Sequence, residues 1–378
     1  MDARYRYDCR QFTGYRPCPW QSECDGCEHY EPKRPQVLVV RVHQLGNVVK
    51  SSPIVHALHK RYDNPWIAWV TSPVAAPLVR ANPLVNEVIE YSWEAAALLT
   101  QRRFELVVSL EANGAEAALA QMVPADERLG FGLHESGSLM PLTEQSVPYV
   151  ALSLSDELRS RVNRKTLAEL VFDLVGVPYE GEEYVLEPSE DEVAYARGVL
   201  RGVGVDPDRE TVVALATGGD SARFATKDWP TEHFAELARR LRAETDVRVV
   251  LVGGPAEREI NRRLKRELGG LVADTGAGHS ITQFAALLGQ CDLVVCGDCF
   301  PMHAAVAVGT PVVSVFGPTP AQEMAIFGRG RKIVTEMECA PCYIRAKETC
   351  PHGWACMPGI TPQRVLGAVV EVLGVYGR

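Results

Sequence analysis

One stretch of the chain combines residue types that bind phosphate. Between Cys296 and Thr319 the sequence reads CGDCFPMHAAVAVGTPVVSVFGPT. A predicted apolar strand ends at Asp298, and His303 follows five residues later at a predicted helix start. Such a turn directs a carboxylate, an imidazole and free backbone N–H groups at one point, as α/β proteins do when they hold a phosphorylated ligand. We therefore expect a phosphate-bearing ligand at this turn.

Apolar runs, separated by helical or turn-rich stretches, predict the strands that must position this turn. They lie at 36–42, 66–72, 86–92 and 104–112 in the first half of the chain, and at 211–218, 248–254, 291–298 and 311–317 in the second half. This alternation is typical of right-handed βαβ units and buried parallel sheets. The sequence therefore predicts an α/β protein with two Rossmann-like domains facing across a cleft.

Composition places the domain boundaries. The predicted parts are a cysteine-rich segment at 1–35, a first Rossmann-like domain at 36–177, a linker at 178–208, a second Rossmann-like domain at 209–335, and a cysteine-rich loop with a C-terminal helix at 336–378. The linker is rich in proline, glycine and acidic residues, as segments between domains commonly are. The last helix, PQRVLGAVVEVLGVYG, is amphipathic and is a candidate for folding back onto the first domain.

Charge and hydropathy exclude several partners and locations. The 378 residues carry a formal charge of −9, and no run of basic residues interleaved with aromatic ones is present, so nucleic acid is not expected as a partner. The N-terminus lacks the apolar core of a secretion signal, and no apolar run reaches the ~20 residues that span a bilayer. We expect a cytoplasmic protein, and peripheral contact with the inner face of the membrane stays open.

Three stretches, taken together, resemble glycosyltransferase family 9, the heptosyltransferases. They are VLVVRVHQLGNVVKSSPIVHAL, TGGDSARFATKDWPTEHFAELARRL and GDCFPMHAAVAVGTPVVSVFGPT, and the resemblance covers the chain from about Gln36 to its C-terminus. It implies a two-domain GT-B fold. It also implies an ADP-heptose donor bound mainly by the C-terminal domain, and a glycan or lipid-linked acceptor held by the N-terminal domain.

Donor-binding residues follow from the resemblance and from the chemistry. Departure of a diphosphate requires cations and helix N-termini near the phosphate oxygens. Lys227 matches the lysine that precedes Trp-Pro in the family, and Asp298 and His303 match its aspartate and histidine. Four further candidates are Gly218 for close backbone approach, Thr226 as a hydroxyl donor, Glu257 for ribose or sugar hydroxyls, and Cys299 beside the phosphate turn. No catalytic metal is expected.

Two residues depart from the family pattern. The first glycine loop of the family reads Gly-Asp, and that aspartate is the proposed general base, whereas this chain has Gly46-Asn47. An amide orients a hydroxyl but does not accept its proton. The alternatives are another base, with His43, His56 and Glu111 as candidates, an inactive relative, or a deliberate substitution. The second departure is Phe300, which occupies a position where many members have glycine.

Eight of the 11 cysteines form two groups of four. Each group contains one Cys-x-x-Cys; the first comprises Cys9, Cys18, Cys24 and Cys27, and the second Cys339, Cys342, Cys350 and Cys356. Four thiolates suit structural zinc or an iron–sulfur cluster, and the spacing does not decide between them. Unmetallated cysteines are the alternative. Cys291 and Cys296 are expected to be buried in or beside a strand.

Three functions are compatible with these patterns. The leading prediction is a glycosyltransferase that moves a heptose or related sugar from an ADP-sugar donor to a glycan or lipopolysaccharide-type acceptor with inversion. The competing prediction is a catalytically impaired relative that binds nucleotide sugars or acts as a metal-containing interaction protein, which Asn47 favours. A metal or redox sensor on the same scaffold is the third, because of the two cysteine groups.

Overall fold

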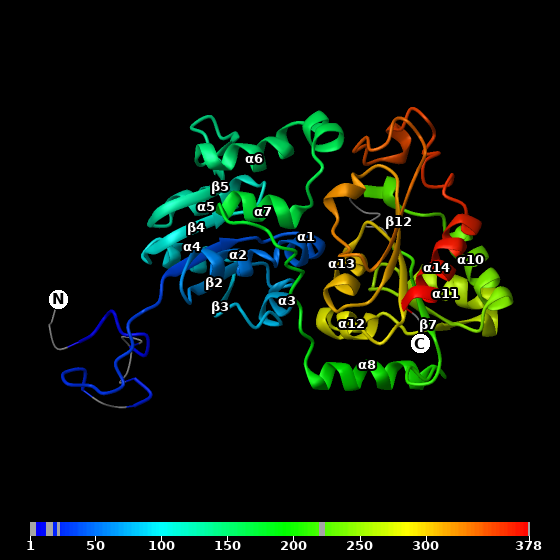
Figure 1. Cartoon of the computed structure of the whole chain (residues 1–378), viewed down its shortest axis with the longest axis horizontal. Coiled ribbons are helices and arrows are strands. Elements are labelled where there is room, and N and C mark those ends of the chain that lie inside the picture. Colours follow the sequence, from blue (N-terminus) through cyan, green and yellow to red (C-terminus); the bar gives the residue numbers. More distant parts are fainter. Residues whose placement is uncertain (1–4, 13–17, 21–22, 219–223, 377–378) are drawn as a thin grey trace.

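Two α/β domains lie side by side, with the N-terminal segment extending away from the first (Figure 1). This computed structural model describes residues 5–12, 18–20, 23–218 and 224–376. Each domain contains a six-stranded sheet, which includes the four strands predicted for that half of the chain and two that were not predicted. The predicted α/β class with two Rossmann-like domains is therefore confirmed.

The N-terminal sheet has the order β3-β2-β1-β4-β5-β6, in which only the β5–β6 pair is antiparallel. Its strands are β1 (Gln36–Val40), β2 (Trp66–Thr71), β3 (Glu87–Glu90), β4 (Phe104–Ser109), β5 (Ala125–Leu133) and β6 (Leu139–Pro141). Val37 and Val39 of β1 enter one hydrophobic cluster, and Leu38 and Val40 enter the cluster on the opposite face. Burial on both faces explains why this strand is continuously apolar.

Helices cover both faces of this sheet (Figure 1). They are α1 (Leu45–Ser51), α2 (Ile54–Arg61), α3 (Ala76–Arg80), α4 (Trp93–Leu99), α5 (Gly114–Met122), α6 (Val147–Leu154) and α7 (Leu167–Val175). Helix α7 begins with a capping box between Thr166 and Glu169 and ends at Gly176 in the left-handed conformation. Local sequence signals therefore explain where this helix begins and where it ends.

The C-terminal sheet is entirely parallel, with the order β12-β11-β10-β7-β8-β9. Its strands are β7 (Val212–Ala216), β8 (Arg248–Val252), β9 (Val272–Asp274), β10 (Leu293–Gly297), β11 (Val312–Phe316) and β12 (Gly330–Val334). Its helices are α8 (Glu190–Gly202), α10 (Thr231–Glu244), α11 (Arg258–Leu268), α12 (Ile281–Leu288), α13 (Phe300–Ala307) and α14 (Pro362–Tyr376).

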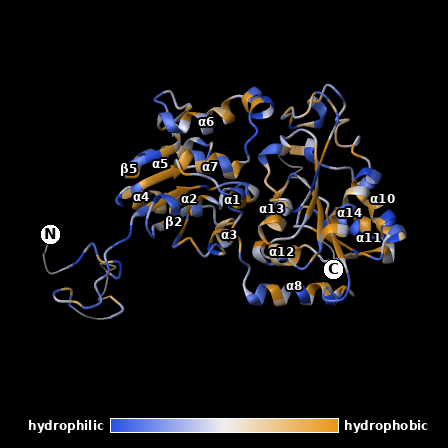
Figure 2. Cartoon of the chain, viewed as in Figure 1, coloured by the Kyte–Doolittle hydropathy of each residue, from blue (hydrophilic) through white to orange (hydrophobic). Residues whose placement is uncertain are grey.

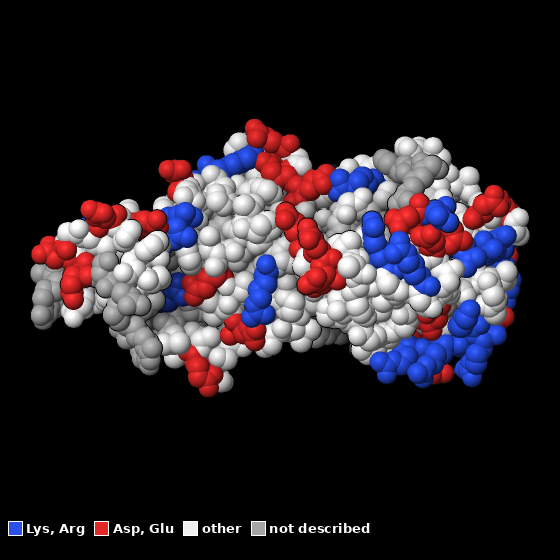
Figure 3. All heavy atoms as spheres, turned by 90° about the horizontal axis from the view of Figure 1, so that it is seen from below, with Lys and Arg blue, Asp and Glu red and all other residues white. Residues whose placement is uncertain are grey.

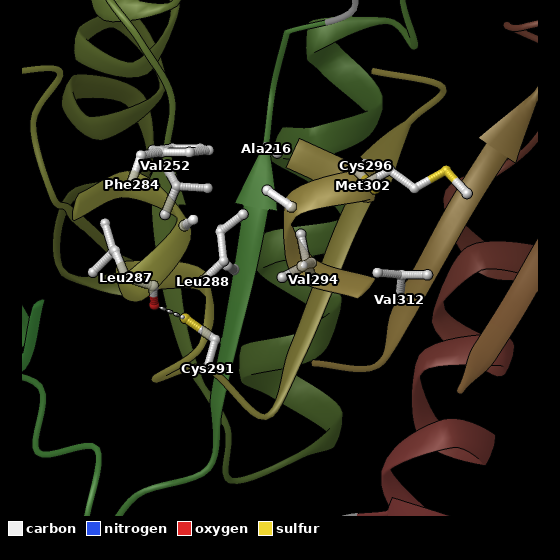
Figure 4. Packing of buried hydrophobic residues seen from close by; sticks show 14 of the residues in the cluster. Ala216, Val252, Phe284, Leu287, Leu288, Cys291, Val294, Cys296, Met302 and Val312 are labelled. Atoms are coloured by element: carbon white, nitrogen blue, oxygen red, sulfur yellow. Dashed lines mark hydrogen bonds between the residues drawn. The ribbon is translucent and has the colours of Figure 1, made fainter. Parts of the chain in front are cut away.

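The core of this domain is formed between α12 and the sheet. Phe284 and Leu288 of α12 pack among apolar side chains of the strands, and Cys291 donates from its Sγ to the Leu287 carbonyl at 3.4 Å (Figure 4). Cys291 and Cys296 are buried, as expected from their positions. In Figure 2 the strands are largely hydrophobic, whereas hydrophilic residues lie on the outer faces of the helices.

Two parts of the chain are arranged differently from the prediction. Within the predicted linker, α8 packs against α12, and its start is fixed by a capping box between Ser189 and Glu192. The C-terminal helix α14 packs on the C-terminal domain against α10, β10, β11 and β12, so the idea that it folds back onto the first domain is wrong. Its apolar face, including Val365 and Val369, completes the core beneath β11.

Charged side chains lie in separate patches on the outer surface (Figure 3). On the face shown in Figure 3, basic side chains gather toward the end formed by the C-terminal domain, and acidic side chains are spread more widely. In the described ranges, none of the helices has both the length and the apolar character needed to cross a membrane.

Candidate functional site

The two domains face each other through the turns that follow their central strands. Strand order reverses between β1 and β4 in the N-terminal sheet and between β7 and β10 in the C-terminal sheet. Ligands of open α/β sheets bind at the carboxyl ends of the strands at such switch points. Strand β1 leads into α1, β10 leads into α13, and these two helices pack together (Figure 1). The two switch points therefore meet at the domain interface.

Lys227, Asp298 and His303 come together at the C-terminal switch point. The Nζ of Lys227 lies 2.9 Å from Asp298 Oδ2 and donates to the Asp298 carbonyl at 3.3 Å. The Nε2 of His303 lies 3.7 Å from Asp298 Oδ1. Asp298 and His303 are buried, whereas Lys227 is slightly exposed. The structure thus brings together the three residues on which the phosphate prediction depended.

Burial and the neighbouring charges fix the ionisation of this group. Burial raises the pKa of Asp298, but Lys227, His303 and Lys50 outweigh it and hold that pKa well below its usual range. Burial lowers the pKa of His303 to about 4, although Asp298 raises it. At neutral pH the site therefore contains an ionised carboxylate and a neutral imidazole. The Nδ1 of His303 is buried and has no hydrogen-bond partner in the described part of the chain.

The N-terminal domain reaches this group through α1. A Cβ placed on Gly46 would lie only 2.8 Å from Cδ2 of His303, so the turn after β1 lies directly against the histidine. From the next turn of α1, Lys50 is buried with its Nζ 3.5 Å from the sulfur of Met324 in the C-terminal domain. Burial lowers the pKa of Lys50 to about 8, against the opposing effect of Asp298 and Glu323.

Lys50 was missed at the level of sequence. Its only signal was a lysine on an otherwise apolar face of a short predicted helix, which also describes many surface lysines. The structure shows a different situation, because the ammonium group is out of solvent and donates a hydrogen bond to the thioether of Met324. A buried cation of this kind calls for an anion nearby.

Gly218 and Glu257 lie together beside the end of β7. A Cβ on Gly218 would lie 2.7 Å from Cγ of Glu257, so the absence of a side chain at 218 makes room for the glutamate. Glu257 is the N-cap residue of α11, and its Oε2 accepts a hydrogen bond from the Gly254 N–H at 2.8 Å. The carboxylate is thereby oriented near the phosphate turn. Gly219, which follows Gly218, lies outside the described residues.

Thr226 has a structural partner in place of the predicted phosphate. Its hydroxyl donates to the Ile344 carbonyl, and the side chain is buried. Its backbone N–H donates to the Arg345 carbonyl at 3.3 Å, and its carbonyl accepts from Trp354 Nε1 at 2.9 Å. The C-terminal cysteine loop therefore holds the segment that carries Lys227.

Cys299 and Phe300 occupy the start of α13. Cys299 is the N-cap residue, and its Sγ donates to the Gly297 carbonyl at 3.4 Å. The ring centres of Phe300 and Phe284 are 6.1 Å apart, so the Phe300 side chain packs toward α12. The substitution of phenylalanine for glycine thus fills the space between two helices.

Asn47 lies in the first turn of α1, where its Nδ2 donates to Oε1 of Gln44. Four residues earlier, His43 Nε2 lies 2.8 Å from Oε1 of Glu116, which is buried in the first turn of α5. Glu111 accepts hydrogen bonds from the backbone N–H groups of Val42 and His43, both at 3.0 Å. The turn after β1 is therefore held by two buried carboxylates.

A hydrogen-bonded ion pair also joins the domains. Arg159, between α6 and α7, donates from Nε and Nη2 to the Glu323 carboxylate at 2.9 and 2.8 Å. Burial lowers the pKa of Arg159, and its hydrogen bond to Glu323 more than compensates, so that pKa is raised overall. This pair joins the segment between α6 and α7 to the C-terminal domain near Lys50, whose pKa Glu323 also influences.

The two cysteine groups differ in their surroundings. All eight thiols are free, and in the described residues no three or more His, Cys, Asp or Glu side chains are arranged to hold a metal. Burial raises the pKa of Cys339 and of Cys356, and the nearby thiols of Cys342 and Cys350 raise both further. The C-terminal thiols are therefore neighbours. Cys9 and Cys27 of the N-terminal group take part in local turns.

Comparisons with known proteins find relatives that share the fold. Lipooligosaccharide heptosyltransferase 2 of Haemophilus influenzae is 27% identical over 364 residues, which cover 89% of this chain and 99% of the relative. The structure of Escherichia coli ADP-heptose lipopolysaccharide heptosyltransferase II superposes with a TM-score of 0.68 at 20% identity, covering 90% of this chain and 99% of that one. Escherichia coli heptosyltransferase WaaC with ADP-2-deoxy-2-fluoro heptose gives 0.60 at 17% identity, covering 89% and 99%.

These likenesses extend over both domains, and the solved structures have the same fold in spite of low identity. Residues 93–352, which include Lys227, Asp298 and His303, match the family described as glycosyltransferase family 9 (heptosyltransferase). The chain belongs to glycosyltransferase family 9 and is a glycosyltransferase of the heptosyl type.

Proposed function

We propose that this protein transfers a heptose, or a closely related sugar, from an ADP-sugar to a glycan or lipopolysaccharide-type acceptor with inversion at the anomeric carbon. The observation that carries the proposal is the group of Lys227, Asp298 and His303 at one switch point, directly against the turn that begins α1 in the other domain. A donor placed there would present its anomeric carbon to an acceptor on the N-terminal side.

The charges suit a leaving diphosphate. Lys227 is held by Asp298, and Lys50 approaches from the other domain, so two ammonium groups flank the position that the phosphates would take. Positioned cations stabilise the negative charge that develops as the sugar departs. The free Nδ1 of the neutral His303 imidazole would accept a hydrogen bond from a sugar hydroxyl, and Glu257 would accept one from the ribose.

The identity of the donor and acceptor rests on the relatives. The names of those compared include an ADP-heptose enzyme and heptosyltransferases of lipooligosaccharide and lipopolysaccharide. We infer the same classes of donor and acceptor for this chain. Since such acceptors are anchored in a lipid, we also propose that the protein works in the cytoplasm at the inner face of the membrane, by peripheral contact.

The test is a thermal-shift screen followed by a transfer assay. ADP and ADP-heptose should raise the melting temperature more than UDP, GDP and their sugars do, because at equal concentration a ligand that binds more tightly stabilises the folded protein more. Purified inner-core lipopolysaccharide with ADP-heptose should then release ADP and gain one heptose, detected by mass spectrometry. Equal stabilisation by all three nucleotides, or ADP binding without transfer, would contradict the proposal.

Asn47 supports a second candidate, a catalytically impaired relative that keeps its nucleotide-sugar site. The amide at 47 hydrogen-bonds to Gln44 and does not act as a base. Transfer that appears only after Asn47→Asp would identify a disabled enzyme. Silence of both proteins, together with ADP binding, would identify a nucleotide-sugar-binding protein.

We further propose that the C-terminal cysteines, and in the same way the N-terminal group, hold structural zinc or an iron–sulfur cluster. Support comes from the four-thiol spacing and, for the C-terminal group, from the mutual proximity of its thiols. To coordinate a metal, the thiols would have to lie closer together than they do in the described residues. Metal analysis and the visible absorption of anaerobically purified protein distinguish zinc from iron. A colourless, metal-free protein whose melting temperature is unchanged by a chelator would contradict both sites.

A further inference from the structure

We propose that His43, oriented by Glu116, is the general base that takes the proton from the acceptor hydroxyl. This inference rests on the proposed transfer reaction. The family places the base at the position that is Asn47 here, so a competent enzyme needs its base elsewhere. The nearest ring nitrogen in the same turn belongs to His43, and the structure pairs it with a buried carboxylate.

The His43–Glu116 contact has the geometry of a catalytic pair. Nε2 of His43 lies 2.8 Å from Oε1 of Glu116, whose side chain is 1% exposed, while the His43 side chain is 43% exposed. The other carboxylate oxygen, Oε2, has no hydrogen-bond partner in the described part of the chain. A carboxylate that accepts from Nε2–H fixes the tautomer and leaves a lone pair on Nδ1. A carboxylate orients the histidine of Ser-His-Asp enzymes in a comparable way, with the two ring nitrogens exchanged: there the carboxylate binds Nδ1–H and Nε2 is the base.

The backbone around His43 is also fixed. The Glu111 carboxylate accepts from the N–H groups of Val42 and His43 and lies 3.6 Å from Nη1 of Arg41. Both oxygens of Glu111 are thus engaged in a buried network, which makes Glu111 a support for the turn rather than a base. The other charged and titratable groups around the pair are Glu111, Arg41 and Tyr91. Burial raises the pKa of Tyr91, and the Glu116 carboxylate raises it further.

The turn that carries His43 also reaches the donor group. Gly46, three residues after His43, lies against His303 of the donor group. His43 and Glu116 follow the neighbouring strands β1 and β4, which form the N-terminal switch point. The third candidate, His56, lies on α2 near Glu182 and Lys60, which face the linker rather than the C-terminal switch point.

The proposed step is a direct displacement. The acceptor oxygen attacks the anomeric carbon of the donor as the bond from that carbon to the diphosphate oxygen breaks, and the diphosphate leaves with the electron pair. Nδ1 of His43 takes the hydroxyl proton, and the Glu116 carboxylate stabilises the imidazolium through the Nε2–H hydrogen bond. The imidazolium then releases the proton to water. Asn47 remains available to orient the acceptor hydroxyl by hydrogen bonding.

The test compares His43→Asn and Glu116→Gln with His59→Asn, a change at an exposed histidine on α2 of the same domain. With ADP-heptose and inner-core lipopolysaccharide, His43→Asn should lower kcat by about 10²- to 10⁴-fold. The dissociation constant for ADP should change by no more than about twofold, since the residue does not contact the nucleotide in this proposal. His59→Asn should match the wild type in both measurements.

The pH dependence separates a catalytic role from a structural one. In the wild type kcat should fall at low pH as the imidazole takes a proton, and this acid limb should disappear in His43→Asn. Glu116→Gln should lower kcat, because an amide no longer stabilises the imidazolium that forms as the proton is taken. Glu116→Asp should recover part of the rate. Melting temperatures of all variants show whether they are folded, and His43→Gln serves as a second variant if His43→Asn is not.

A rescue experiment closes the test. Asn47→Asp in the His43→Asn background should restore transfer, since it returns a carboxylate to the position used by the family. A His43→Asn protein that transfers heptose at the wild-type rate would overturn the role of His43 alone. A wild type that binds ADP but transfers nothing would overturn the proposed function, and activity only in Asn47→Asp would show that His43 is no working base.

Discussion

The turn after β10 and the turn after β1 face each other but are built differently. On the C-terminal side, the charges are matched: Lys227 pairs with Asp298, and the His303 beside them is neutral. On the N-terminal side, Lys50 is buried and donates a hydrogen bond to the thioether of Met324. One turn is therefore electrostatically complete within the protein, whereas the other presents a cation that a ligand would neutralise.

The surroundings of Lys50 show the same imbalance. Its pKa reflects two carboxylates, Asp298 and Glu323, and two further cations, Lys227 and Arg159. With Lys50 itself, three positive groups face two negative ones. A diphosphate entering between the turns would reverse this excess, and its charge would be shared by groups from both domains. Donor binding should therefore stabilise the contact between the domains.

The largest effect is expected at the complete turn. Lys227→Met should lower kcat/KM for the ADP-sugar by about 10²- to 10³-fold, because it removes a positioned cation from the leaving group. Steady-state kinetics measures the loss. Lys165→Met is the matched control. Lys165 lies in the N-terminal domain, where it forms an exposed ion pair with Asp173, so this variant should leave kcat/KM unchanged. An equal, small loss in both variants would show that Lys227 is a structural residue only.

Lys50→Met should separate donor binding from stability. Loss of a charge-assisted contact, worth about 1.5–3 kcal/mol, should weaken ADP binding by about 10- to 100-fold. Stability should change in the opposite direction, because burial lowers the pKa of Lys50 from an ordinary 10.5 to about 8. At ~1.4 kcal/mol per unit, keeping this lysine charged costs the wild type on the order of 3 kcal/mol.

The sign of the pH effect follows from proton binding. Between about pH 8 and 10.5 the unfolded chain keeps a proton that the folded chain has released, so wild-type stability rises with pH in this window. Below pH 8 the full cost is present, and there Lys50→Met should be more stable than the wild type. The difference should shrink toward pH 10.5. Urea unfolding at several pH values measures this difference in stability. A variant less stable than the wild type at pH 7 would show that the buried charge of Lys50 does not destabilise the folded protein.

The two turns also differ in how far the sequence predicted them. The strands were recognisable because burial on both faces makes them continuously apolar, and Asp298 and His303 share one strand–helix turn. Lys227 was predicted to lie with them because it matches the family's lysine before Trp-Pro. His43 was one of three candidate bases, but Glu116 was not expected beside it. The two residues are far apart in the sequence, and only the pairing of β1 with β4 brings them together.

Long-range packing accounts for the other differences. The amphipathic pattern of α14 specified an apolar face but not the surface that covers it, and the structure shows that the cysteine loop returns the chain to β11 and α10. Thr226 was expected at the phosphates because of its place beside Lys227, yet its hydroxyl meets the Ile344 carbonyl. Both outcomes depend on a loop whose path no local pattern determines.

That loop provides the smallest expected effect, which tests whether the donor turn depends on the cysteines. The Thr226 N–H donates to the Arg345 carbonyl, and the indole Nε1 of Trp354 donates to the Thr226 carbonyl, so the loop holds Thr226 beside Lys227. The centre of the Trp354 ring lies 3.5 Å from Nζ of Lys347. Cys342→Ser should loosen this contact, lower the melting temperature by about 2–4 °C for each kcal/mol lost, and weaken ADP binding about twofold to threefold. Cys24→Ser, in the segment that extends from the other domain, should leave ADP affinity unchanged. Calorimetric titration with ADP measures both variants, and equal effects would show that the donor turn keeps its shape without help from the loop.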